Sequence, residues 1–305
     1  MANRKVSLLL RTAAFTMALA FAAQGAAASA QSLAPGEFAD YVEDGRTRLH
    51  HAAEALPRFD ALLAAVRTGE GGLAGLPLEA LRKLAGDAHV ANFYYAGARA
   101  DAHREIIEEL LRRSEASDQE FADFHATLVA DRRWDEARAF AARFPEITLE
   151  KIPDVIDQTT DRGAPAYLRH DPATGHLVRE SFDAGPGPLL LVVSHPGCAF
   201  SRRAMAAIAA NPELDQALPA RRLFLAPTFG GLKLDWISRW NADQPVFPHV
   251  LVDQPALWPQ VRSWATPQFL FLVDGDVVAS VEGWPGDEQA EALMAAARLG
   301  ADAAD

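Results

Sequence analysis

The sequence predicts an α/β domain, built as a mixed sheet flanked by helices, that follows an all-α N-terminal domain. Two observations support this division. Residues 38–144 are rich in Ala, Leu, Glu and Arg and poor in β-branched residues, which is typical of helices. After Pro145, short apolar runs alternate with helical segments, and this order indicates a sheet with helices packed on it.

The first thirty residues form a separate segment with the pattern of a secretory signal. A short cationic start precedes a mostly apolar stretch over residues 6–23, and Ala28-Ser29-Ala30 offers small residues for cleavage. Arg11 leaves too few consecutive apolar residues for a transmembrane helix, which needs about 20. We therefore expect a signal peptide over residues 1–30, a periplasmic or secreted protein, and a mature chain that does not span the membrane.

The composition limits the partners and the redox chemistry of the chain. The formal net charge is −12 and no basic stripe offsets the acids, so we expect no nucleic-acid partner. Cys198 is the single cysteine, which excludes an internal disulfide. In an oxidising compartment such a thiol is buried and inert, paired with a partner, or reactive.

Residues 36–150 are predicted to form the helical domain. Apolar residues recur at three- and four-residue steps, with a break near Pro57, and Ser117 with Glu120 fits a capping box. Asp101 and Asp135 are 34 residues apart, which is the tetratricopeptide period, but the sequence offers two weak copies where stacked repeats need three or more. We therefore favour a helical bundle or an irregular hairpin array that contacts a client or partner.

Residues 160–305 are predicted to form the α/β domain. Alternating apolar and polar residues, apolar runs and turn residues define its elements. In order, they are a β-hairpin over 166–182, a buried strand over 188–195, a helix over 201–210, a strand over 221–228, helical or loop segments over 235–243 and 256–264, a hairpin over 266–284 that turns at Asp274-Gly275, and a helix over 287–304.

The junction between the buried strand and the next helix carries the candidate chemistry. Cys198 falls at the N-terminus of this helix, where unpaired N–H groups and the helix dipole favour a thiolate. Arg202 and Arg203 add positive charge within one turn, and His195 could do likewise if protonated. Ser201 can donate a hydrogen bond to the thiolate, but it cannot form a disulfide.

Three features together make residues 164–299 resemble the thioredoxin superfamily. They are the Cys-x-x-Ser of residues 198–201 between a strand and a helix, Thr266-Pro267 before an apolar strand, and the hairpin that follows. The long insert before Thr266 is similar to the exported branch that includes TlpA. The resemblance implies that Pro267 is cis and lies against the cysteine, and that Thr266 and Pro267 align the backbone of a client.

Three departures from the family pattern narrow the chemistry that the resemblance implies. Ser201 replaces the second cysteine, Gly197 replaces the aromatic residue before the nucleophile, and Val192 replaces a buried acid. Ordinary dithiol activity is therefore not expected. Cys-Ala-Phe-Ser also resembles the Cys-Gly-Phe-Ser of monothiol glutaredoxins, although their upstream lysine has no counterpart nearby.

Two functions remain open from the sequence. In the first, an exported monothiol thioredoxin-like protein forms mixed disulfides with protein clients through Cys198, in thiol–disulfide exchange or isomerisation, and an external thiol donor releases them. In the second, the fold is a redox-inactive binding or scaffold module in which Cys198 is a structural small hydrophobe. We expect no cofactor and no metal, because His195 and Cys198 are too few ligands for a site.

Overall fold

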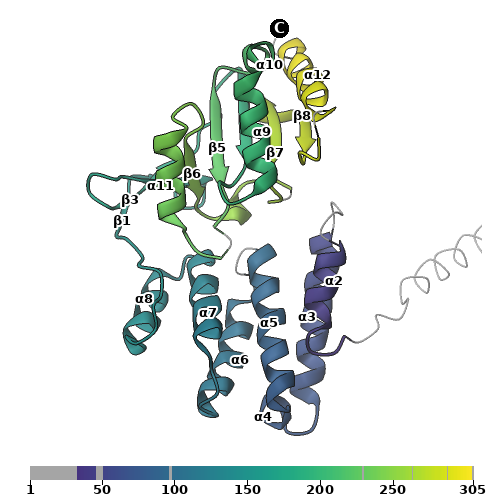
Figure 1. Cartoon of the computed structure of the whole chain (residues 1–305), viewed down its shortest axis with the longest axis vertical. Coiled ribbons are helices and arrows are strands. Elements are labelled where there is room, and N and C mark those ends of the chain that lie inside the picture. The colour runs from purple at the N-terminus through teal and green to yellow at the C-terminus, as the bar shows by residue number, and fades with distance from the viewer. Residues whose placement is uncertain are drawn as a thin grey trace, which may run out of the picture.

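The computed structural model describes residues 33–45, 51–95, 98–228, 230–262, 264–286 and 288–303. The predicted signal peptide lies outside these residues. The described chain has an all-helical part, drawn in the lower half of Figure 1, and a part with a mixed sheet and flanking helices above it.

The helical part is a set of helices that lie side by side around one apolar core (Figure 1). The Ser117–Glu120 capping box is confirmed, because each side chain bonds the other residue's backbone N–H. The predicted break at Pro57 is wrong, since the helix continues through it. The missing N–H of Pro57 removes a single bond near the helix start, and the buried Ala55 and Phe59 hold this turn against the core. The helices are α2 (Glu37–Gly45), α3 (His51–Thr68), α4 (Gly72–Gly75), α5 (Leu78–Tyr94), α6 (Ala100–Arg112), α7 (Asp118–Ala130) and α8 (Trp134–Arg143).

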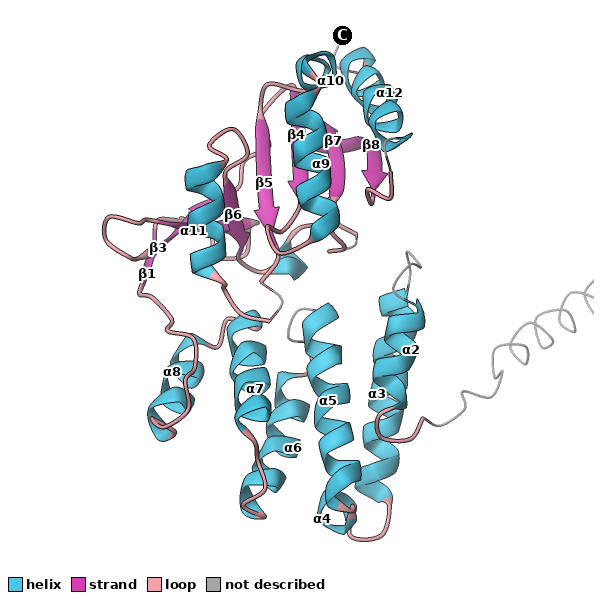
Figure 2. Cartoon of the chain, in the orientation of Figure 1, coloured by secondary structure: helices cyan, strands magenta, loops and turns pink. Residues whose placement is uncertain are grey.

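The second part contains an eight-stranded sheet in the order β1-β3-β2-β6-β5-β4-β7-β8 (Figure 2). The central strands β4, β5 and β6 run parallel, and β7 and β2 pair antiparallel on either side of them. The strands are β1 (Val155–Asp157), β2 (Ala166–His170), β3 (Leu177–Ser181), β4 (Pro188–Val193), β5 (Arg222–Ala226), β6 (His249–Val252), β7 (Gln268–Val273) and β8 (Asp276–Glu282). Both predicted hairpins are confirmed, as β2–β3 and β7–β8.

Helices cover one face of this sheet, and an irregular segment covers the other. Residues of α9, α10 and α12 pack on the face that presents Val192, Phe224 and Phe269. Trp258 and its neighbours, which follow a short 3-10 helix η1 (Pro255–Leu257), pack on the opposite face. The helices are α9 (Ala199–Ala210), α10 (Pro212–Ala217), α11 (Leu234–Asp243) and α12 (Glu288–Asp302).

Strands β1 and β6 were not predicted from the sequence. β6 has four residues and follows Pro248 directly, so it carries little periodicity. It is nonetheless the strand that joins the β2–β3 hairpin to β5 and thus makes one continuous sheet. β1 has three residues at the sheet edge and pairs only with β3, which explains why local pattern did not reveal it.

The helical part and the sheet share one core. Leu168, Ala226 and Leu251 from the sheet belong to the same buried cluster as the helices. The turn after α7 adds a polar connection, because Arg132 donates to the backbone oxygen of Val252 and lies 3.4 Å from the carboxylate of Asp253. Buried apolar contacts and buried polar contacts therefore hold the helical part against the sheet.

Candidate functional site

Cys198 stands at the junction of β4 and α9. It is the N-cap of α9 in an extended conformation, and its backbone N–H donates to the His195 oxygen at 2.9 Å, which closes the turn after the strand. Its own carbonyl accepts from the Arg202 N–H at 3.1 Å and so begins the helix. The residue is half-buried, so the sulfur lies at the surface end of the sheet.

Thr266 and Pro267 bring the start of β7 against this turn. The Cys198 thiol donates to the Thr266 carbonyl oxygen with 3.4 Å between sulfur and oxygen. The Thr266–Pro267 peptide bond is cis, as the resemblance implies. The carbonyl of the buried Pro267 accepts from the Gly283 N–H at 2.8 Å, which anchors this segment to the β8 side of the hairpin.

The environment of the sulfur favours the thiolate on balance. Burial raises the pKa of the Cys198 thiol, but hydrogen bonds from the Thr266 side chain, from Ser201 and from the Phe200 backbone lower it further than burial raises it. The net pKa lies below the ordinary value of 9.0. The thiol bond to the Thr266 carbonyl acts in the opposite direction, because it exists only in the protonated form.

His195 does not supply the positive charge that the sequence suggested. Burial, and secondarily the nearby Lys233, lowers the pKa of His195 to about 4, so the ring is neutral at pH 7. Its Nδ1 accepts from the Gly197 N–H at 2.9 Å, which a neutral ring protonated on Nε2 can do. The backbone N–H of His195 also donates to the Ser201 hydroxyl at 3.3 Å, so its role in this geometry is to shape the turn.

The two arginines after Cys198 contribute charge without bonding the sulfur. The Arg202 guanidinium donates to the Pro196 carbonyl at 2.7 Å and thereby fixes the turn before the cysteine. The Arg203 guanidinium stacks 4.7 Å from the centre of the Phe200 ring. Arg202 is therefore part of the site as a positioning group and a source of positive potential.

An aromatic side chain from another element lies against position 197. A Cβ atom on Gly197 would lie 2.7 Å from Cζ3 of Trp236 and 2.9 Å from Nδ1 of His195. Trp236 belongs to α11 and is 53% exposed. Gly197 takes the place of an aromatic residue in the sequence pattern, but its missing side chain leaves room for the aromatic ring of Trp236.

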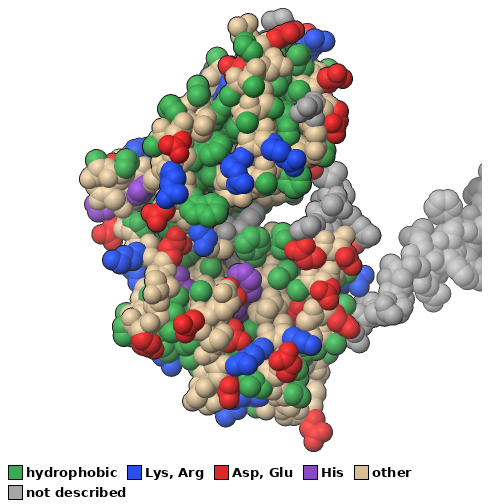
Figure 3. Space-filling model, in the orientation of Figure 1, with side chains coloured by type: hydrophobic (Ala, Val, Ile, Leu, Met, Phe, Trp, Pro, Cys, Tyr) green, Lys and Arg blue, Asp and Glu red, His purple; other side chains and the backbone are tan. Residues whose placement is uncertain are grey.

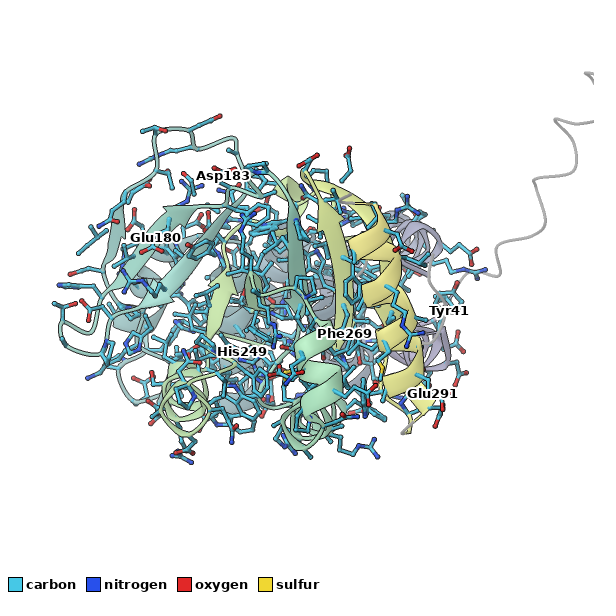
Figure 4. All side chains as sticks on the ribbon, turned by 90° about the horizontal axis from the view of Figure 1, so that it is seen from above. Tyr41, Glu180, Asp183, His249, Phe269 and Glu291 are labelled. Carbon is cyan, nitrogen blue, oxygen red and sulfur yellow. The ribbon has the colours of Figure 1, made fainter. Side chains whose placement is uncertain are left out.

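Beneath this turn lies a buried polar pair that sequence reasoning missed. The Ser194 hydroxyl and Nε2 of His249 are 2.5 Å apart, and Nδ1 of His249 lies 3.0 Å from the Phe247 carbonyl. Nδ1 therefore carries the proton, and Nε2 accepts from Ser194. Burial lowers the pKa of His249 to about 3. Seen from above, His249 and Phe269 lie between the sheet and its helix layer (Figure 4).

His249 lies in the same cross-strand row of the sheet as Val192. Val192 pairs with Phe224, and Phe224 pairs with His249. All three are buried on the same face. The missed strand β6 is the reason that this neighbour could not be predicted, since its register places His249 two strands from Val192.

The site offers no arrangement for a metal. In the described ranges, no group of three or more His, Cys, Asp and Glu residues lies close enough to hold an ion. Nδ1 of His195 is already engaged by the Gly197 N–H, so it does not point a free lone pair at Cys198. None of the described helices has the length and apolarity that a bilayer crossing requires.

The comparisons with known proteins add little to this geometry. No protein-family model matches the sequence, and neither does any of the curated proteins compared with it. Among solved structures, a solution structure of a candidate thioredoxin from Neisseria meningitidis is similar over 46% of this chain and 93% of its own, with 17% identity and a TM-score of 0.29.

Proposed function

We propose that this protein is an exported monothiol protein of thioredoxin-like fold that forms mixed disulfides with protein clients through Cys198. The observation that carries the proposal is the position of this sulfur at the start of α9, opposite the Thr266-Pro267 segment. The lowered pKa of Cys198 raises its thiolate fraction at a given pH and so supports attack by the sulfur.

The proposed reaction is thiol–disulfide exchange. The Cys198 thiolate attacks one sulfur of a client disulfide; the new S–S bond forms as the client bond breaks, and the other client sulfur leaves as a thiolate. Ser201 offers no second thiol, so a thiolate from an external donor attacks the mixed disulfide and displaces Cys198 as a thiolate. The cycle conserves electrons, because each S–S bond broken is replaced by one formed.

Thr266 couples binding to the state of the sulfur in this proposal. Its carbonyl accepts from the thiol, so ionisation of Cys198 removes that donor and frees the carbonyl for a backbone N–H of the client. Ser201 supports the thiolate through its hydroxyl, which is oriented by the His195 N–H. The client is thus bound best when the sulfur is ready to attack.

A redox-inactive binding or scaffold role is the second candidate. It is favoured by Val192, which leaves the buried row beneath the site without a carboxylate, and by a His249 that stays neutral. In that role the half-buried Cys198 packs against β7 and does not react.

Reaction with an uncharged aromatic disulfide such as dithiodipyridine separates the two functions. We expect the folded protein to form one mixed disulfide, detected by its mass, and a dithiol to release it, whereas Cys198→Ala forms none. If Cys198 reacts only after the protein has been denatured, the scaffold role is the correct one.

A further inference from the structure

The surface around Cys198 carries positive charge that the chain does not neutralise. Arg202, Arg203, Lys233 and Arg239 are exposed, and no carboxylate of the described residues lies within ion-pair distance of their side chains. Figure 3 shows Lys and Arg side chains gathered over α9 and α11, next to the helical part. This patch contrasts with the chain as a whole, whose net charge is −12.

The contrast is not a general property of the arginines in this protein. Most of the described arginines elsewhere pair with acids, as Arg99 does with Asp60 at 2.6 Å and Arg222 does with Asp215. The first turn of α9 contains no acidic residue, so nothing offsets its dipole either.

Apolar groups lie within the same surface. Phe200 is 47% exposed and Trp236 is 53% exposed, the first just after Cys198 and the second against the turn just before it. A shallow groove of about 260 Å³ runs beside Trp236, lined also by Pro196, Trp240, Arg239 and Asp243. Large exposed aromatic side chains at such a place are typical of a binding surface.

We propose that this surface binds acidic client segments that carry an apolar side chain near their cysteine. The cations of α9 and α11 attract the acids, and the groove between Pro196 and the two tryptophans accepts the apolar side chain. Three acids reduce the local positive charge: Asp235, Asp243 and Glu150, whose carboxylate accepts from the Lys233 backbone N–H at 2.7 Å. The four cations still outnumber them. The inference rests on the proposed function for its link to Cys198, and it adds the class of client.

Peptide binding tests the inference apart from the chemistry. The probes are fluorescent peptides of equal length with serine in place of the client cysteine: one rich in Glu with a single Phe, its Lys-rich counterpart, and the Glu peptide without Phe. We expect the Glu-Phe peptide to bind about tenfold more tightly than either of the others at low salt. Its advantage over the Lys peptide should shrink at 1 M salt, where the Debye length falls to about 3 Å.

A double variant of the patch and a matched double variant elsewhere test whether the preference for acidic peptides comes from this surface. Arg203→Gln with Arg239→Gln should remove most of the preference for acid, whereas Arg143→Gln with Arg298→Gln should keep it. Arg143 stacks on Phe144 as Arg203 stacks on Phe200, and Arg298 is exposed on α12, so the control removes equal charge elsewhere. Equal binding of acidic and basic peptides, equal losses in both variants, or saturation through self-association in a sedimentation run would each overturn the inference.

Dithiodipyridine applied to the same proteins keeps the two proposals distinguishable. If this uncharged probe reacts with Cys198 while acidic peptides gain no advantage, the client class is wrong and the exchange function stands. If acidic peptides bind preferentially to a protein whose thiol is inert, the surface is right and the exchange function fails.

Discussion

The thiol of Cys198 donates a hydrogen bond to the carbonyl oxygen of Thr266, with 3.4 Å between the two atoms. The bond joins the start of α9 to the segment before β7, although 68 residues separate the partners in the chain. This bond holds the sulfur at the end of the sheet. Because ionisation of the thiol removes the bond, it also couples the protonation state of Cys198 to binding at the Thr266 carbonyl.

Ser201 is predicted to stabilise the thiolate. Ser201→Ala removes a hydroxyl hydrogen bond that lowers the pKa of Cys198, so that pKa should rise and alkylation at pH 7 should slow severalfold. The measurement is the alkylation rate across pH. Ser280→Ala on the exposed face of β8 is the control and should leave the profile unchanged. An unshifted profile in Ser201→Ala would remove the serine from the site.

Ser201→Cys is predicted to restore a dithiol. Side chains three residues apart on a helix are neighbours, and a disulfide spans Cα atoms about 4.4–6.8 Å apart. After mild oxidation, thiol titration should find no free thiol, and the variant should gain disulfide reductase activity. Ala209→Cys near the end of α9 should keep two free thiols under the same treatment. Two titratable thiols in oxidised Ser201→Cys would contradict the geometry at the helix start.

Gly197 is predicted to be required by the packing of Trp236. Gly197→Ala places a Cβ atom 2.7 Å from the indole ring of Trp236, which is 53% exposed and can shift. We therefore expect a loss of about 0.5–1.5 kcal/mol in the free energy of unfolding. Adding Trp236→Ala should recover part of that loss in a double-mutant cycle. Gly86→Ala in α5, where no atom lies within 4 Å of the new Cβ, should instead stabilise the protein. Additive losses in the cycle would show that the two residues do not interact.

Asp253 is predicted to be essential for the docking of the helical part. Its carboxylate accepts from Arg179 at 2.7 Å and lies 3.4 Å from Arg132, and all three side chains are buried. Burial lowers the pKa of Arg132 to about 10, so it remains charged at neutral pH. Asp253→Asn leaves the buried Arg132 without its ion pair, whereas Arg179 keeps a contact with Asp157 at 3.4 Å. The substitution should lower the free energy of unfolding by about 3–5 kcal/mol, measured by chemical denaturation.

The control for this substitution is an exposed acid of the helical part. Asp135→Asn affects a surface pair with Arg138 and should cost less than about 1 kcal/mol. A similar small cost for Asp253→Asn would mean that the docking depends on the apolar core alone.

Stability is predicted to fall on mild acidification. Burial lowers the pKa of His103 and of His249 to about 3 and that of His195 to about 4, so below pH 6.5 the unfolded chain binds protons that the folded chain refuses. Asp87 acts in the opposite sense, because burial raises its pKa to about 6. The unfolded chain therefore binds about two more protons than the folded chain between pH 6 and 4. Over this range the free energy of unfolding should fall by up to about 3 kcal/mol per pH unit.

Denaturant titrations at several pH values measure this slope. His103→Asn should flatten it, since His103 is fully buried with its Nδ1 2.9 Å from the Thr127 hydroxyl. A stability that stays level between pH 6 and 4 would contradict the buried, neutral state of these rings.

The sequence predicted the elements that local pattern encodes. The strand before Cys198, the helix after it and both hairpins are present because long apolar runs and the Asp274-Gly275 turn mark them. β6 was not predictable in this way, since a four-residue strand gains its stability from β2 and β5 and not from its own pattern.

Only the site residues that belong to the motif could be predicted, because the others reach the site through long-range packing. Cys198, Ser201, Thr266 and Pro267 were found from the motif, and the structure brings them together. Trp236 and His249 come from the insert, whose register no local signal fixes. The protonation of His195 was left open, because burial cannot be inferred from the sequence of a turn; in the structure burial lowers its pKa to about 4.

The reactivity of Cys198 in the folded protein is the most direct test of the proposed disulfide exchange. The measurement is the rate of alkylation by iodoacetamide at pH 7, compared with a cysteine-containing model peptide and with the protein in denaturant. We expect the folded protein to react faster than the peptide, with a rate that follows a pKa below 9.0. A sulfur that reacts more slowly than the peptide, and only after unfolding, would contradict it.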